Sequence, residues 1–214
     1  MKPLAKAFNA LGYKPVPGAE KYQFIKTGVG NRETGSIKID ILTGPKKSFD
    51  GSRVKTDDRR AQPRPRVGIH AHPLDEALTL NEGLRKVVID GNLSTGETWQ
   101  GEVFLPHPYT FLMMKIFAFR DRLEDKDREF GRYHAIDMYS IVATITEDEW
   151  EGAKELSKRY AEDDYIKEAG SLVSTYFSSF TSLGIIRLRE SPYYTPEFRI
   201  EEFISALQEI FPHK

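Results

Sequence analysis

The sequence predicts an α+β protein, with a small mixed sheet first and a helical C-terminal region after it. Short segments that alternate apolar and polar residues, or that are rich in Val and Ile, occur up to Leu105. From Pro106 onward the apolar residues recur at helical spacing instead. We therefore divide the chain into an α/β region, 1–105, and a helical region, 106–214, and expect the two to pack as one structural unit.

The first region is predicted to contain short strands separated by turns. An amphipathic helix over 4–11 ends at Gly12, because glycine readily adopts the backbone conformation that closes a helix. Lys21–Lys26 and Ser36–Leu42 are expected to be two strands, paired through a turn over 28–31. Further short strands are expected at 67–71, 86–90 and 98–105, with a short helix or extended segment over 74–80 and a turn over 92–96.

Thr43–Arg66 is a long basic segment. It contains eight Lys and Arg residues against three Asp residues, together with three prolines and two glycines. A loop of this length inside a compact domain is usually functional or disordered. We favour a mobile, solvated loop, and the alternative is a contact with RNA through the basic residues of 46–66.

The segment 106–145 organises the rest of the chain. Phe111–Phe119 is apolar except at Lys115, and a helix that is apolar on all sides is a buried helix. Burying this ammonium is costly unless it meets an anion or its long side chain reaches the surface, so the sequence implies an anionic partner, either a carboxylate or a bound phosphate. Asp137 is the candidate carboxylate, because it lies with His134 on an otherwise apolar face of the next helix.

A charged link over 120–129 joins these two helices. A short link that carries both signs of charge most simply forms the solvated tip of a helical hairpin, here over about Pro108–Thr144. The hairpin would bring Lys115 within salt-bridge distance of Asp137. A structural ion pair with no further role is the alternative interpretation of these two residues.

Three more helices are predicted after the hairpin. Thr146 and Glu149 have the spacing of a capping box, so a helix is expected over 147–160. The apolar residues of 166–180 and 197–211 also recur at helical spacing, and the last segment has the wider apolar face.

Composition excludes several classes of protein. The chain has 214 residues and no cysteine, which excludes disulfides, thiolate metal sites and cysteine nucleophiles. A formal net charge of -1 excludes general attraction to nucleic acid, so any such contact needs a local basic patch. No apolar run is long enough to span a bilayer and no signal peptide follows Met1, so we expect a cytoplasmic protein with no membrane partner.

His70 and His72 point the same way from a strand, but without a third ligand we interpret them as ordinary polar residues rather than a metal pair.

Two segments carry a resemblance to a known family. Ile37–Leu42, with Asp40 near its end, and 109–141 together resemble the nucleotidyltransferase-like proteins related to the AbiEii abortive-infection toxins, in the minimal-nucleotidyltransferase superfamily. Lys115 with Arg120 is similar to the lysine motif of that family, and His134–Tyr139, which contains Asp137, is similar to its closing aspartate motif. Asp40 is similar to the carboxylate on a later strand of the family's sheet.

The resemblance implies an activity and a set of roles. The reaction would transfer a nucleoside monophosphate from a nucleoside triphosphate to an RNA or protein acceptor, with Mg²⁺ as cofactor. Asp40 would be a catalytic residue and the metal ligand, and Asp137 would be catalytic by orienting the lysine or assisting proton transfer. Lys115 and Arg120 would bind the nucleotide phosphates. The resemblance also implies a place in a toxin–antitoxin or phage-defence system, with a cognate antitoxin protein as a candidate partner.

The sequence departs from the family in one element. A Gly-Ser turn followed by Asp-x-Asp should precede Asp40 and is not found, so 1–105 looks like a truncated nucleotidyltransferase-like region. Either the coding region begins upstream of Met1, or the chain keeps the scaffold without the chemistry. We expect no nucleotidyl transfer by the chain as given. The alternative function is that of a non-catalytic nucleotide- or protein-binding module.

Overall fold

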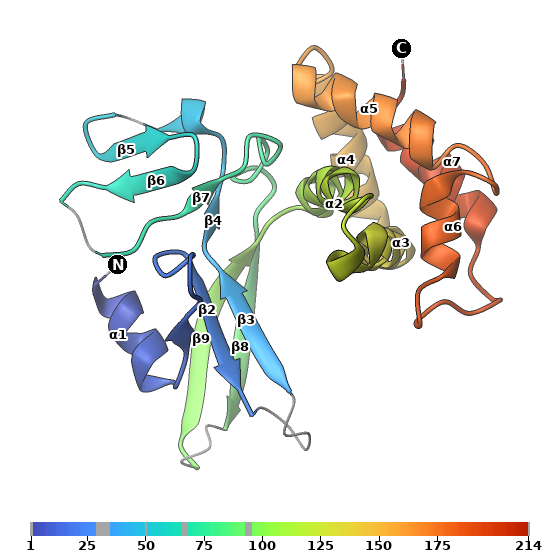
Figure 1. Ribbon diagram of the computed structural model, residues 1–214. Helices are drawn as coiled ribbons and strands as arrows, with labels where there is room; N and C mark the ends of the chain where they lie inside the picture. The colour runs from blue at the N-terminus through green and yellow to red at the C-terminus, as the bar shows by residue number, and fades with distance from the viewer. Residues whose placement is uncertain (1, 29–34, 50, 66–67, 93–95, 214) are drawn as a thin grey trace. The chain divides into compact units, whose positions relative to one another are not determined.

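The computed structural model describes residues 2–28, 35–49, 51–65, 68–92 and 96–213 (Figure 1). The chain forms two compact units, Met1–Leu78 and Thr79–Lys214, and each is described by itself. The division follows Leu78, whereas the sequence places the boundary after Leu105. The last two strands therefore belong to the same unit as the helices after Pro106.

The N-terminal unit contains a three-stranded antiparallel sheet in the order β1-β2-β3. Strands β2 and β3 pair from Gln23↔Asp40 to Thr27↔Ser36, which confirms the predicted pairing. The buried ring of Phe24 on β2 lies 4.7 Å from the ring of Phe8 on α1, so the helix packs on this sheet. Most of the predicted turn over 28–31 lies outside the described residues. The elements are α1 (Lys2–Ala10), β1 (Lys14–Pro15), β2 (Gln23–Thr27), β3 (Ser36–Asp40), β4 (Leu42–Thr43), the 3-10 helix η1 (Lys46–Ser48), β5 (Val54–Asp57), β6 (Arg60–Pro63) and β7 (His72–Pro73).

The basic segment after β3 is folded. Strands β5 and β6 form an antiparallel hairpin, and β4 pairs in parallel with β7. The Nζ of Lys46 lies 3.3 Å from the Asp58 carboxylate, and the Arg60 guanidinium lies 2.8 Å from Asp57. The expected mobile, solvated loop is therefore wrong for the described part of 43–66, which forms paired strands and a 3-10 helix.

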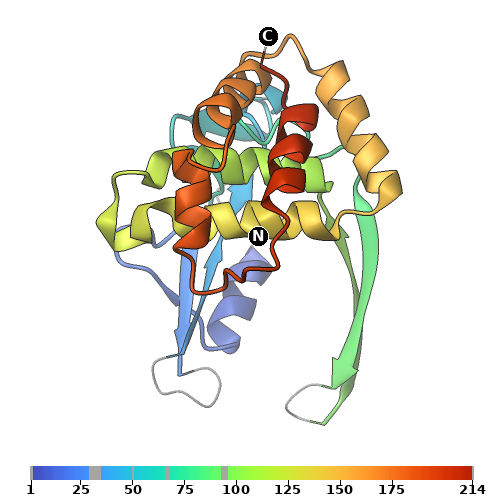
Figure 2. The ribbon, with the colours of Figure 1, turned by 90° about the vertical axis from the view of Figure 1, so that its right-hand side faces the viewer.

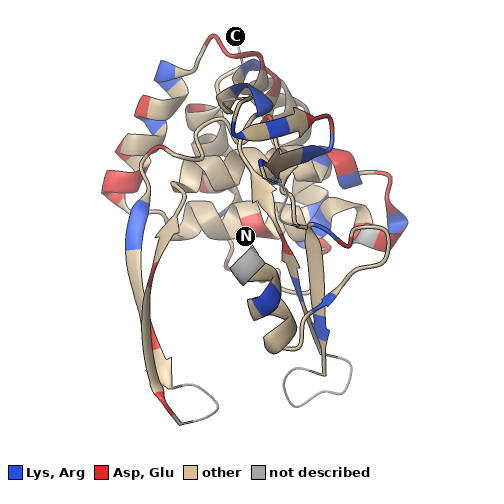
Figure 3. Ribbon diagram, turned by 90° about the vertical axis from the view of Figure 1, so that its left-hand side faces the viewer, with Lys and Arg blue, Asp and Glu red and all other residues tan. Residues whose placement is uncertain are grey.

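The second unit begins with a β-hairpin and continues with helices. Strands β8 and β9 pair from Arg85↔Leu105 to Asn92↔Thr98. Figure 3 shows basic residues on this hairpin near the helices and acidic residues farther along it. The elements are β8 (Arg85–Asn92), β9 (Thr98–Leu105), α2 (Pro108–Arg122), the 3-10 helix η2 (Lys126–Gly131), α3 (Arg132–Thr144), α4 (Glu147–Arg159), α5 (Asp164–Tyr176), α6 (Leu183–Arg189) and α7 (Ile200–Ile210).

Helix α2 is the centre of the helical unit. It contacts α3, α4 and α5, and Figure 2 shows α2 and α3 side by side. Because neighbours cover several of its faces, its apolar residues occur around most of the helix rather than in one stripe. The buried side chains of α2 are Tyr109, Thr110, Leu112, Met113, Ile116, Phe117 and Phe119.

The α+β class and the helical hairpin over 108–144 are confirmed. In the described residues the strands form separate small sheets instead of one mixed sheet. Helix α4 and its capping box are as predicted, whereas α6 lies entirely in a segment for which no helix was predicted. Within the described residues, no helix has the length and apolar character needed to cross a bilayer.

Candidate functional site

Lys115 of α2 and Asp137 of α3 form a direct ion pair. The Lys115 Nζ donates to Oδ2 of Asp137 over 2.6 Å, which confirms the predicted contact. The two side chains are 32% and 44% exposed, so solvent or a ligand can reach both charged groups. An ammonium has three N–H donors, and this bond uses one of them. Among the described residues this ammonium forms no other side-chain hydrogen bond, so its remaining donors can meet a second anion.

His107 and Gly131 position the two helices that carry this pair. Nδ1 of His107 accepts a hydrogen bond from the backbone nitrogen of Tyr109 over 3.1 Å and so caps the N-terminus of α2. Gly131, just before α3, has a φ of +78°, and a Cβ there would lie 3.1 Å from the carbonyl oxygen of Phe119. Glycine therefore allows the start of α3 to approach α2 closely.

His134 lies one turn before Asp137 on α3 and is half-buried. Burial lowers its pKa from the ordinary value, the positive charge of Lys115 lowers it further, and the Asp137 carboxylate opposes this shift. In the described part of the chain its Nδ1 has no hydrogen-bond partner. We therefore expect a neutral imidazole at neutral pH, which adds no cation to the site.

Arg120 is bound by two carboxylates. Its guanidinium lies 2.7 Å from Asp121 and 2.5 Å from Glu168, and it stacks over the Phe117 ring with 4.8 Å to the ring centroid. Lys115 and Arg120 are five residues apart, which places them roughly 140° apart around the helix axis. The structure therefore does not bring the two predicted phosphate-binding cations together.

Asp40 lies at the end of β3, opposite Gln23, and belongs to the N-terminal unit. An oxygen of its carboxylate lies 4.0 Å from the Nζ of Lys38 on the same strand. No group of three His, Asp or Glu side chains that could hold a metal ion is present among the described residues. Since Mg²⁺ needs several oxygen ligands in nearly octahedral geometry, the described donors do not fit the cofactor that the resemblance implies.

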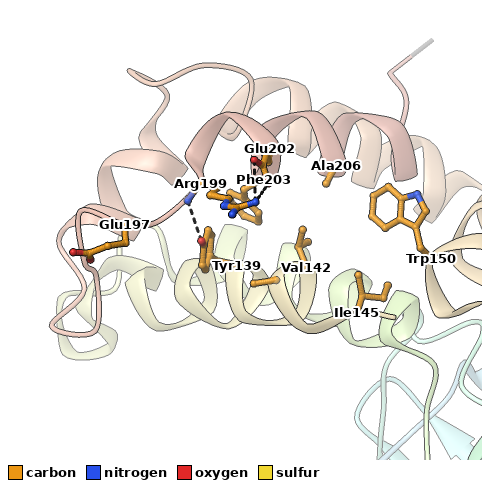
Figure 4. A pocket seen from close by; sticks show the side chains of 10 residues that line it. Tyr139, Val142, Ile145, Trp150, Glu197, Arg199, Glu202, Phe203 and Ala206 are labelled. Atoms are coloured by element: carbon orange, nitrogen blue, oxygen red, sulfur yellow. Dashed lines mark hydrogen bonds and ion pairs between the residues drawn. The ribbon is translucent and has the colours of Figure 1, made fainter. Parts of the chain in front are cut away.

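A pocket of about 410 Å³ lies between α3 and α7. Figure 4 shows Tyr139 of α3 and Phe203 of α7 in this pocket, with Trp150 at one end. The hydroxyl of Tyr139 accepts a hydrogen bond from the backbone nitrogen of Arg199 over 3.0 Å, and its ring stacks on Phe198 with 4.0 Å between centroids. The tyrosine of the predicted aspartate motif therefore anchors the segment before α7 on α3.

Comparison with known proteins adds no further constraint on this site. No family model, no curated protein and no solved structure matches the chain. The functional argument depends on the residues and their geometry.

Proposed function

We propose that this chain is a nucleotidyltransferase-like protein that binds the phosphates of a nucleoside triphosphate at Lys115 without transferring the nucleotidyl group. The ion pair of Lys115 with Asp137, at 2.6 Å, carries the proposal. A lysine on an otherwise buried helix, held by a carboxylate and still 32% exposed, presents its ammonium in a fixed place. Lys115 is also the residue to which the resemblance assigns phosphate binding.

Asp137 has two opposite effects on such a ligand. Its carboxylate orients the Lys115 ammonium, so that the remaining N–H donors point to a defined place. It also neutralises part of the lysine charge and repels a phosphate that approaches closely. We therefore expect weak binding that decreases further as salt is added, since the pair is open to solvent.

The described carboxylates account for the expected lack of transfer. In-line attack on the α-phosphate of a nucleoside triphosphate commonly uses two divalent ions, which bridge the attacking and leaving oxygens. Asp40 has no neighbouring carboxylates that complete such a set among the described residues. The chain as given therefore keeps a phosphate-binding lysine without the charge stabilisation that the reaction needs.

A protein-binding module is the second candidate function. A groove of about 540 Å³ on the helical unit is lined by aromatic side chains, among them Phe180, Tyr194 and Phe198. Phe180 is 48% exposed. Aromatic residues are enriched in protein–protein interfaces, so this groove favours a protein partner such as a cognate antitoxin. Replacing Phe180 by Ala would reduce partner binding and leave nucleotide binding unchanged.

Thermal melting with each nucleoside triphosphate and Mg²⁺ tests the phosphate site. We expect the ligand to raise the melting temperature of the wild-type chain and to have no effect on Lys115→Met. Lys154→Met is the matched control, because Lys154 is 35% exposed and pairs with Glu151 at 2.5 Å. The control should respond like the wild type. Equal shifts in all three proteins would rule out phosphate binding at Lys115.

A transfer assay tests the lack of catalysis. The purified chain is incubated with labelled nucleoside triphosphates, Mg²⁺ or Mn²⁺, and a mixture of RNA and protein acceptors. We expect no labelled acceptor. Label that appears with the wild type and disappears in Asp40→Asn would show that the chain is an active nucleotidyltransferase after all.

A further inference from the structure

A cleft of about 730 Å³ opens on the N-terminal unit, and the proposed function does not use it. Its lining includes Tyr22, His70 and His72. The turn between β5 and β6 with its flanking residues, 57–60, also lines the cleft. Figure 3 shows both basic and acidic residues on this part of the chain.

The three rings form a stacked platform. The Tyr22 ring lies 5.5 Å from the His70 imidazole with an interplanar angle of 29°, and 5.8 Å from the His72 imidazole with an angle of 27°. Tyr22 and His72 are half-buried, so part of the platform faces the open cleft. Planar nucleobases stack on platforms of this kind, because Tyr and His rings offer flat, polarisable faces.

The platform is held in place before any ligand arrives. His70 is only 5% exposed, and its backbone nitrogen donates to the carbonyl oxygen of Lys21 over 3.2 Å. Nδ1 of His72 lies 3.2 Å from the carbonyl oxygen of Arg59, which ties this ring to the β5–β6 turn. A bridge between Ala61 and Ala71 joins β6 to the segment that carries both histidines. A ligand would therefore meet a preformed surface.

The turn carries two Asp and two Arg residues, and within the described part of the chain one of these cations forms no ion pair. Asp57 accepts from the Arg60 guanidinium over 2.8 Å and from the Arg59 backbone nitrogen over 3.0 Å. Asp58 pairs with Lys46 at 3.3 Å. The Arg59 guanidinium has no ion-pair partner among the described residues, although it lines the cleft. Its planar fork of N–H donors suits a phosphate.

The electrostatic environment of His70 agrees with this charge distribution. Burial lowers the pKa of His70 most, the positive charges of Arg60 and Lys21 lower it further, and the Asp57 carboxylate opposes this shift. Cations therefore lie close enough to the His70 ring to act on it, and an anionic ligand in the cleft can pair with them. A metal ion is a poorer candidate, because the described residues here contain no set of three metal-binding side chains.

We propose that this cleft binds one nucleotide, whose base stacks on the platform of Tyr22, His70 and His72 and whose phosphate pairs with Arg59. The ligand is either a free nucleoside monophosphate or one nucleotide of a single-stranded RNA. Both sources present the same base and phosphate to the cleft. The lining of the cleft does not include Lys115, so this proposal stands even if the proposed triphosphate site fails.

Fluorescence anisotropy with a labelled single-stranded RNA octamer tests the cleft, and unlabelled AMP and UMP serve as competitors. We expect Tyr22→Ala to weaken RNA binding roughly 5- to 150-fold, the range found when one base-stacking ring is lost. Tyr22→Phe keeps the ring and should bind like the wild type. Arg59→Gln should weaken binding and lower the slope of log affinity against log salt by about 0.7, the value for one phosphate contact on a single strand.

Two controls separate this site from general attraction and from the Lys115 site. Lys55→Gln removes a positive charge from β5 at a residue that does not line the cleft, and it should affect binding less than Arg59→Gln. Lys115→Met should leave RNA binding unchanged. Competition by AMP and UMP at a stoichiometry of one would assign the cleft to free mononucleotides, and its absence would assign the cleft to the strand. No binding by the wild type, unchanged binding by Tyr22→Ala, or equal losses in Lys55→Gln and Arg59→Gln would overturn the proposal.

Discussion

A lysine on a buried helix is tolerated where its ammonium reaches an anion, water or both. Lys115 reaches Asp137 at 2.6 Å and remains partly open to solvent. Solvent screens the attraction, so the pair contributes less to stability than a fully buried pair would. The pair is better suited to holding an ammonium in a defined place than to stabilising the fold.

Substitution at this pair should separate stability from binding. The side chains of Lys115 and Asp137 are 32% and 44% exposed, so water screens their attraction. We therefore expect Asp137→Asn to lower the free energy of unfolding by only about 0–1 kcal/mol. Lys115→Met should cost no more, since an unbranched apolar side chain fits the buried surroundings of α2. Urea denaturation measures both changes. A loss of about 3 kcal/mol or more for Asp137→Asn would indicate a pair shielded from water.

Buried histidines should make stability depend on pH. Burial lowers the pKa of His107 and His134 from the ordinary value of 6.5 in the folded chain. Below that value the unfolded chain binds protons that the folded chain does not, so unfolding becomes easier as the pH falls. The stability that the neutral histidines contribute is fully present above about pH 6.5. It decreases as the pH drops toward their lowered pKa values in the folded chain.

Melting temperatures between pH 7.5 and 5.5 check this expectation. Carboxylates such as Glu149, whose pKa is lowered from 4.5 by hydrogen bonding to the Thr146 backbone, lose their contribution only at more acidic pH. We expect a decrease in melting temperature over this range and a smaller decrease in His134→Gln. An unchanged melting temperature in the wild type would contradict it.

The sequence predicts some of these residues better than others. Lys115 and Asp137 could be predicted, because a charge within an apolar helical pattern implies a partner and the charged link implies a hairpin. The spacing of His70 and His72 predicts that they share a side, and both line one cleft. Tyr22 could not be assigned to them, since no local pattern links residues so far apart in the chain.

At the scale of elements, helices α2 and α4 pack on either side of the His107 side chain. Its imidazole, which caps α2, lies against two glycines: a Cβ at Gly83 would be 3.0 Å from Cδ2, and a Cβ at Gly152 would be 2.8 Å from Nε2. Gly83 also has a φ of +59°, a conformation that L side chains rarely adopt. The two glycines therefore leave room for the cap.

Gly152→Ala tests this arrangement. Within a helix this change usually stabilises by about 0.5–1 kcal/mol. Here we expect a loss of about 1–3 kcal/mol, because the added methyl group would crowd the buried imidazole. In a His107→Ala background the same change should stabilise, and a double-mutant cycle by urea denaturation measures the coupling. Stabilisation by Gly152→Ala in the wild type would show that the imidazole moves freely.

Elements with strong local signals could be predicted from the sequence. Helix α4 has a capping box at Thr146 and Glu149, and α1 ends near Gly12, whose φ is +81°. Helix α6 has only seven residues, too few for a clear helical period. The hairpin of β5 and β6 was missed because its strands carry charged residues and lack a clear apolar alternation. Their pairing is apparent only after the chain has turned.

At the scale of the whole molecule, the order of strands followed by helices was enough to predict the α+β class. The number of sheets was not predictable in the same way, because strand patterns do not state which strands become neighbours. The compact units divide after Leu78, whereas the sequence pattern changes from strands to helices after Leu105. The sequence pattern of the β8–β9 hairpin is that of a strand region, yet the hairpin belongs to the same compact unit as helices α2 to α7.

In the β8–β9 hairpin, amides that point to the partner strand alternate with amides that point outward. The outer edges of both strands have no further strand beside them in the described sheet order. Deuterium exchange should therefore follow a period of two along each strand, with neighbours such as Val88 and Ile89 exchanging at clearly different rates. The slowly exchanging amides are those that point to the partner strand, and they exchange when the hairpin opens. Their exchange rate therefore measures the free energy of local opening of the hairpin, separately from global unfolding of the helices.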